Sequence, residues 1–156
     1  MAEFVSTCEG QLSRRDMADL YAIASGHPEG ARDPHIRWYI DRDRQLRSAV
    51  ARARAARAGA DVTAHQREYA GFDASTEQAG SQALAIDDPL ERALALDRHR
   101  WRLLDEMVSV NDFSSEAVFA YAFRLQLLEQ WQRRTDAAGE AAAVHIVDHN
   151  LSGLQL

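Results

Sequence analysis

The sequence has little of several residue types that small proteins use for covalent stabilisation or for chemistry. Among its 156 residues there are one cysteine, three prolines and no lysine, so all 18 basic residues are arginines. The single Cys8 excludes an internal disulfide and a zinc site built from several cysteines, and we expect it to be a small, half-buried core residue. No apolar run approaches the roughly 18 to 20 residues that span a bilayer. Because the N-terminus also lacks the pattern of a signal peptide, we expect a cytoplasmic protein without direct membrane insertion.

The length predicts a single helical domain, residues 1–156, that can bury a core without metals or disulfides. No run of alternating β-branched residues predicts a strand, so the expected fold is all-α. It would be a compact bundle of about five to six helices. Residues 61–86 have weak periodicity and predict a loosely structured connection, and residues 151–156 predict a frayed tail. The expected helices cover residues 2–10, 14–25, 34–58, 89–110, 115–134 and 138–150.

Helix boundaries are marked by capping residues. Asp33 and Asp88 each stand before a proline, which predicts an N-cap followed by proline in the first helical position. Ser114 predicts a third N-cap. Gly59 predicts the C-cap of the helix that begins after Asp33.

The two long helices near 89–110 and 115–134 are expected to form the centre of the bundle. Helix 89–110 has two apolar stripes on opposite sides, one with Leu90, Leu94, Trp101, Leu104 and Val108 and a second with Leu96, Leu103, Met107 and Val110. Such a helix must be covered on two sides, which makes Leu96, Leu103 and Met107 candidates for a partner interface. Helix 115–134 is apolar nearly all round, which predicts a bundle centre or, as the alternative, a helix completed by another protein.

Positive charge is concentrated in residues 37–57, which hold seven arginines and two aspartates in a chain of formal net charge −6. At 100° per residue these arginines fall all round the helix, with Asp43 and Arg47 four residues apart inside its apolar sector. One interpretation is a packed amphipathic helix with a solvated outer face. The other is a helix clamped between its own bundle and a partner that bears carboxylates, with Arg37, Arg44, Arg47 and Arg54 in the interface.

Charge reversal at Arg47 would separate these cases. If Asp43 and Arg47 are buried together, the change should unfold the protein; otherwise it should weaken a partner. A nucleic-acid interface would need basic residues on one face of a basic domain, so we predict no nucleic-acid partner.

The sequence shows no catalytic motif. GxxxxGK[ST], GxGxxG, GxSxG and HExxH are all absent. His145 and His149 are one helical turn apart and form a weak candidate metal pair, but no third and fourth ligands suggest themselves. His99, within "DRHRW", is expected on a charged face. We therefore expect no enzyme activity, no cofactor and no metal site.

Several stretches resemble an uncharacterised bacterial family that is encoded in V-type ATPase operons, a domain of unknown function numbered 2764. The resemblance begins at "EFVSTCEGQLSRRDMADL", continues in "WYIDRDRQLRSAVARARAARAG", and is strongest in "DDPLERALALDRHRWRLLDEM" and "FSSEAVFAYAFRLQLLEQWQRRTDAAGEA". It covers residues 3–147, although Ser48 stands where the family pattern has asparagine. The positions that carry it best are Trp101, Asp105, Phe113, Tyr121, Leu125, Gln126, Leu128, Glu129, Trp131, Asp136 and Gly139.

The arginine helix is also similar to helices of the all-α component that couples the central stalk to the rotor ring in archaeal and vacuolar-type ATPases. These resemblances imply a non-catalytic subunit or accessory factor of a rotary ATPase, with other subunits of the central stalk or rotor side as partners. They also imply a cytoplasmic location, peripheral to the inner membrane through the complex. The alternatives are a stand-alone helical interaction module of another complex, dimeric through an exposed stripe, and a small metal-binding helical protein.

Overall fold

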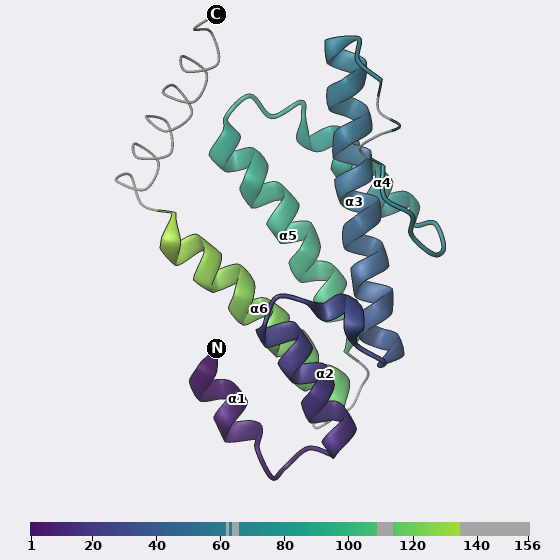
Figure 1. Cartoon of the computed structure of the whole chain (residues 1–156). Helices are drawn as coiled ribbons and strands as arrows, with labels where there is room; N and C mark the ends of the chain where they lie inside the picture. The colour runs from purple at the N-terminus through teal and green to yellow at the C-terminus, as the bar shows by residue number, and fades with distance from the viewer. Residues whose placement is uncertain (62, 64–65, 109–113, 135–156) are drawn as a thin grey trace, which may run out of the picture.

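The computed structural model describes residues 1–61, 63, 66–108 and 114–134, and these residues form six α-helices (Figure 1). Within these ranges there is no β-strand, so the predicted all-α bundle is confirmed. A short 3-10 helix, η1 (Pro28–Gly30), lies in the connection before the longest helix. The α-helices are α1 (Ala2–Cys8), α2 (Arg14–Ala24), α3 (Pro34–Ala58), α4 (Ala74–Ala83), α5 (Pro89–Met107) and α6 (Ser115–Arg133).

The predicted caps are confirmed. The side chains of Asp33, Asp88 and Ser114 each accept hydrogen bonds from amides in the first turn of the helix that follows. Gly59 ends α3 in the left-handed conformation, with φ of 63°, which glycine adopts without the Cβ penalty of other residues. Local chemistry therefore sets both ends of α3 and the start of α5 and α6.

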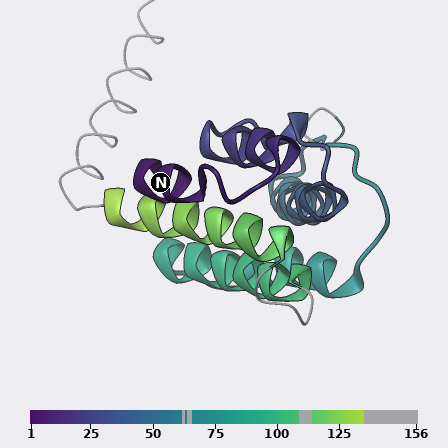
Figure 2. The same cartoon turned by 90° about the horizontal axis from the view of Figure 1, so that it is seen from below.

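Helix α6 lies at the centre of the bundle, as predicted. Seen from below, it lies between α5 and the pair formed by α1 and α2, while α3 is viewed nearly end-on beside them (Figure 2). Helix α6 contacts α2, α3 and α5. The apolar residues buried between these helices include Leu20, Ile23, Ile36, Leu103, Leu104, Met107, Phe119, Phe123 and Leu127.

The expected loose connection at residues 61–86 contains a regular helix, α4, which corrects the sequence-based prediction. Asp73 caps it, and it packs closely against α3. The approach is close because Gly80 faces the larger helix: a Cβ built on Gly80 would lie 2.5 Å from the Cβ of Ala49 and 2.9 Å from the carbonyl oxygen of Leu46. Helix α4 is thus buried through small residues, which hydrophobic periodicity does not reveal.

Other boundaries differ by a few residues from those expected. Helix α1 ends at Cys8 rather than at residue 10, and α5 ends at Met107 rather than at residue 110. Cys8 is 9% exposed and belongs to the core, and burial raises the pKa of its thiol. The helix expected at 138–150 and the tail at 151–156 lie outside the described residues. In the part of the chain that the structure describes, no helix is long and apolar enough to cross a bilayer.

The two stripes of α5 have the opposite roles from those predicted. Leu103 and Met107 are 2% and 3% exposed and lie in the core, so a partner cannot contact them in the folded chain. The other stripe stays open, since Leu90 is 57% exposed and Trp101 is 38% exposed. The reason is that the core of α2, α3 and α6 covers the side of α5 that carries Leu103 and Met107.

Candidate functional site: an arginine cleft beside an apolar groove

The arginines of α3 divide into two groups, of which the first is bonded within the chain. Arg42 is 6% exposed, and its guanidinium donates to the side chain of Gln45 at 3.1 Å and to the carbonyl oxygen of Ala70 at 2.6 Å. Arg52 forms a bidentate pair with Glu77 of α4, at 2.6 and 2.7 Å. Such geometry requires the planar fork of arginine, which lysine does not have. These arginines hold α4 and its preceding loop on α3.

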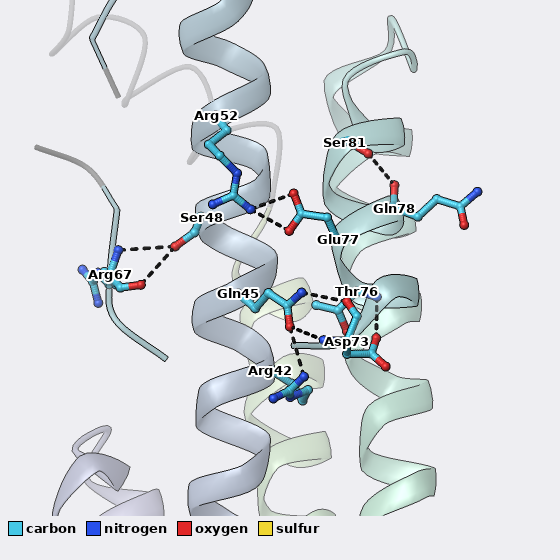
Figure 3. Close-up of polar contacts among 10 residues, drawn as sticks. All are labelled: Arg42, Gln45, Ser48, Arg52, Arg67, Asp73, Thr76, Glu77, Gln78 and Ser81. Atoms are coloured by element: carbon cyan, nitrogen blue, oxygen red, sulfur yellow. Dashed lines mark hydrogen bonds and ion pairs between the residues drawn. The ribbon is translucent and has the colours of Figure 1, made fainter. Parts of the chain in front are cut away.

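Successive turns of α3 present polar side chains to the loop at residues 67–73 (Figure 3). The side-chain amide of Gln45 donates to the carbonyl oxygen of Asp73 at 2.7 Å and accepts from its backbone N–H at 3.0 Å. The hydroxyl of Ser48 accepts from the N–H of Arg67 at 3.3 Å. Ser48 is the position where the family pattern has asparagine. The role of this row of side chains is structural, because it satisfies the backbone of a loop that lacks regular structure.

Asp73 connects this row to α4. Hydrogen bonds from the Ser75 hydroxyl and the Thr76 backbone amide stabilise its carboxylate and lower the pKa of Asp73 to about 2. The carboxylate is therefore charged at neutral pH, as an N-cap requires.

His99 is buried, which corrects its expected place on a charged face. It is 2% exposed, and its ring lies between the hydroxyl of Thr76, 2.9 Å from Nε2, and the guanidinium of Arg102, 2.8 Å from Nδ1. Because a guanidinium can only donate, Nδ1 must accept, and the ring proton lies on Nε2. The ring is therefore neutral, and burial, followed by the charge of Arg102, lowers the pKa of His99.

The stability of the protein is expected to fall as the pH drops through about 6.5, the ordinary pKa of histidine in an unfolded chain. Below that pH the unfolded state binds a proton that folded His99 does not bind, so stability rises with pH across this window and the loss ends below the folded pKa. Thermal melts of the natural protein and of His99→Gln between pH 7.5 and pH 5 measure this slope. The variant should show a smaller slope, whereas His27→Gln, at an exposed histidine, should not. Equal slopes for the natural protein and His99→Gln would contradict the prediction.

The second group of arginines surrounds a cavity of about 600 Å³, which we call the arginine cleft. Residues of α3, α5 and α6 line it, together with the turn after α2 and the loop before α4. Arginines outnumber carboxylates on its walls by two, which makes the cleft positive in a chain that is negative overall. The charged side chains that line it are Arg44, Arg47, Arg67, Arg100, Arg133 and Arg134 with Glu29, Asp43, Asp97 and Glu129.

Arg100 lies at the inner end of the cleft and joins α3 to α5. It donates to Asp43 at 2.8 Å and to Asp97 at 2.6 Å, and its side chain is 18% exposed. Burial alone would lower the pKa of Arg100, but the two carboxylates outweigh burial and raise it above its ordinary value. Asp43 also pairs with Arg47 at 2.6 Å, so the predicted pair of Asp43 and Arg47 is present. It is not buried as a unit, because the side chain of Arg47 is 57% exposed.

The outer arginines of the cleft are less tightly held. Arg44, Arg133 and Arg134 lie 3.6, 3.8 and 3.8 Å from carboxylate oxygens, distances beyond those of good hydrogen bonds. Their side chains are between 33% and 80% exposed. Each guanidinium has five N–H donors in a fixed geometry that suits a carboxylate. The mouth of the cleft can therefore bind acidic side chains of another molecule.

An apolar groove with a volume of about 260 Å³ lies beside the cleft on α5 and α6, and we call it the tryptophan groove. The indole N–H of Trp131 donates to Asp97 at 2.9 Å, which fixes the orientation of the ring. The guanidinium of Arg134 lies 4.3 Å from the centre of that ring. Asp97 lines both the cleft and the groove. The groove is lined by Leu94, Asp97, Arg98, Trp101, Leu127, Leu128 and Trp131.

The structure brings some of the expected site residues together and separates others. Arg44 and Arg47 line the cleft, whereas Arg37 and Arg54 do not. Leu96 is half-buried. The candidate metal pair, His145 and His149, lies outside the described residues, and within the described ranges no three histidine, cysteine or acidic side chains are placed to share a metal ion.

Sequence reasoning missed Asp97, Arg100 and Trp131, which connect the two surfaces. Their spacing carried a partial signal, since Asp97 and Arg100 are three residues apart and can pair on one helix. Trp131 belongs to the family pattern, but nothing local relates it to Asp97, which is 34 residues away in sequence.

Comparison with known proteins gives one match. Residues 81–153 match a family described as "Protein of unknown function (DUF2764)". This range includes α5, α6 and the tryptophan groove, and it supports the resemblance to an uncharacterised family over that part of the chain. No curated protein and no solved structure matches.

Proposed function

We propose that this chain is a non-catalytic component of a V-type rotary ATPase, as a structural subunit or an accessory factor. It would bind acidic side chains of another subunit of the central stalk or rotor side in the arginine cleft. In this proposal the protein is cytoplasmic and lies at the membrane through the complex. The ATPase assignment rests on the family resemblance, and the binding mode rests on the cleft.

The observation that carries the binding mode is the division of the arginines on α3. Arg42 and Arg52 are bonded inside the fold, whereas Arg44 and Arg47 face a positive cleft in a chain of net charge −6. Like charges gathered at one surface oppose folding slightly and favour an oppositely charged partner. A surface of this kind supports protein binding better than catalysis, because no nucleophile and base were found together in the described residues that line it.

The proposal is tested by a tagged pull-down from the native cells in mild detergent, followed by mass spectrometry. Recovery of rotary ATPase subunits in a fixed ratio is the expected result. Recovery of an unrelated complex in a fixed ratio would instead favour a helical interaction module with another role. Recovery of the tagged chain alone would contradict both.

Charge reversal in the cleft, with Arg47→Glu, is expected to leave the protein folded and to weaken the partner. The change removes an ion pair whose arginine is mostly exposed, so the free energy of unfolding should fall by no more than about 1 kcal/mol. Binding should weaken by about tenfold, which corresponds to about 1.4 kcal/mol, because a repulsive charge replaces an attractive one. Thermal melts and the yield of co-purified subunits measure the two effects.

Arg15→Glu is the matched control, because Arg15 is an exposed arginine on α2 that does not line the cleft. It should change neither the melting temperature nor the yield of partner by much. If Arg47→Glu and Arg15→Glu recover the partner equally well, the cleft is not the binding surface, even if the ATPase assignment holds.

A further inference from the structure

We infer that the tryptophan groove is a docking site for this chain's own C-terminal segment, residues 140–154, which packs an apolar stripe between α5 and α6. This inference is independent of the proposed ATPase role. It assigns an occupant to the apolar stripe of α5 that the described helices leave open.

The groove needs an apolar occupant. Leu128 is 49% exposed and Trp101 is 38% exposed, while Leu127 beneath them is 8% exposed. Apart from Asp97 and Arg98, every residue that lines the groove is leucine or tryptophan. Covering such side chains stabilises a protein by roughly 25 cal/mol for each Å² of apolar surface removed from water.

The sequence after α6 contains a matching apolar stripe. Val144, Val147, Leu151 and Leu154 follow one another at spacings of three, four and three residues. On a helix these positions share one face, and His145 and His149 fall on the other. The helix expected at 138–150 would be about 20 Å long at 1.5 Å per residue, about twice the length of α5 between Leu94 and Trp101.

Charge also favours this pairing. Residues 135–156 contain Asp136, Glu140 and Asp148 and have no arginine or lysine. The groove carries Arg98 on its wall and Arg134 over the ring of Trp131. The segment is therefore negative where the rim of the groove is positive.

Connectivity places the segment beside the groove. Trp131 lines the groove, and α6 ends two residues later at Arg133. Gly139 lies between this end and the apolar stripe, and glycine readily allows the chain to reverse direction. The family match spans residues 81–153, so it includes the two helices of the groove and most of the proposed occupant as one unit.

Short-range fluorescence quenching in the full chain tests this inference. In a Cys8→Ala background, Asn150→Cys is labelled with bimane, a fluorophore that is quenched when it contacts a tryptophan. Asn150 lies beside the stripe without being part of it. We expect the label to be strongly quenched, and we expect Trp101→Phe to restore most of its emission. Trp38→Phe should not do so, because Trp38 packs against the core rather than in the groove.

Two matched substitutions in the segment complete the test. Val147→Asp should release the label from quenching, whereas His145→Asp, with the same charge on the other face of the helix, should not. Circular dichroism confirms that each variant is folded. Quenching that does not depend on Trp101 would overturn the inference. Quenching that increases with protein concentration would also overturn it, because a second copy of the chain would then occupy the groove.

Discussion

Replacing Asp97 with alanine is expected to lower the free energy of unfolding by about 3 kcal/mol, at the lower end of the range for removing one partner of a buried ion pair. Asp97 is 8% exposed and accepts from Arg100 at 2.6 Å and from the indole of Trp131 at 2.9 Å. Its loss leaves a largely buried guanidinium with Asp43 alone. Urea unfolding followed by circular dichroism measures the change.

Two further variants show whether charge or shape is responsible. Asp97→Asn keeps an oxygen for the indole of Trp131 but removes the charge beside Arg100, so its effect should lie between those of the natural residue and alanine. Asp105→Ala removes a mostly exposed carboxylate that pairs with Arg124, and it should cost less than about 1 kcal/mol. If Asp97→Ala and Asp105→Ala were equally mild, Arg100 would not depend on Asp97.

Substitution of Gly80 by alanine is expected to destabilise the protein, although alanine is the better helix former. The added methyl would lie 2.5 Å from the Cβ of Ala49 and 2.9 Å from the carbonyl oxygen of Leu46, which belongs to the rigid backbone of α3. Overpacking of this kind costs about 1–3 kcal/mol, against a gain of at most about 1 kcal/mol in helix propensity. We expect a net loss of at least about 1 kcal/mol, and a larger loss for Gly80→Val.

Gly30→Ala is the control for this prediction. A Cβ on Gly30 would have no neighbour within 4 Å, and Gly30 lies in η1 without a positive φ. Thermal melts of the two variants should therefore diverge, with Gly30→Ala close to the natural protein. A rise in melting temperature for Gly80→Ala would show that α4 can move away from α3 at little cost.

The features that the sequence predicted correctly are those determined by neighbouring residues. Asp33 and Asp88 before proline, Ser114, and Gly59 act through hydrogen bonds within one turn, so their roles are readable from short stretches. The central position of α6 was also predictable, because a helix that is apolar nearly all round needs neighbours on most sides.

The features that the sequence did not predict depend on which helix packs against which. Helix α4 buries Thr76, Gly80 and Ala83, residues too small or polar to mark a buried face. Helix α5 has two apolar stripes, and periodicity cannot say that Leu103, rather than Trp101, faces the core. His99, Asp97 and Arg100 have a charged or polar pattern, yet they are buried because Thr76, Trp131 and Asp43 reach them from other helices.

Gln45 also has a consequence for the order in which the protein assembles. It holds both backbone polar groups of Asp73, whose side chain in turn caps α4. The first turn of α4 is therefore correctly placed after α3 has formed, and the two are expected to open together in native-state hydrogen exchange. The amide of Asp73 reports on this coupling: a shared exchange rate with the first turn of α4 would identify α3, its loop and α4 as one cooperative unit.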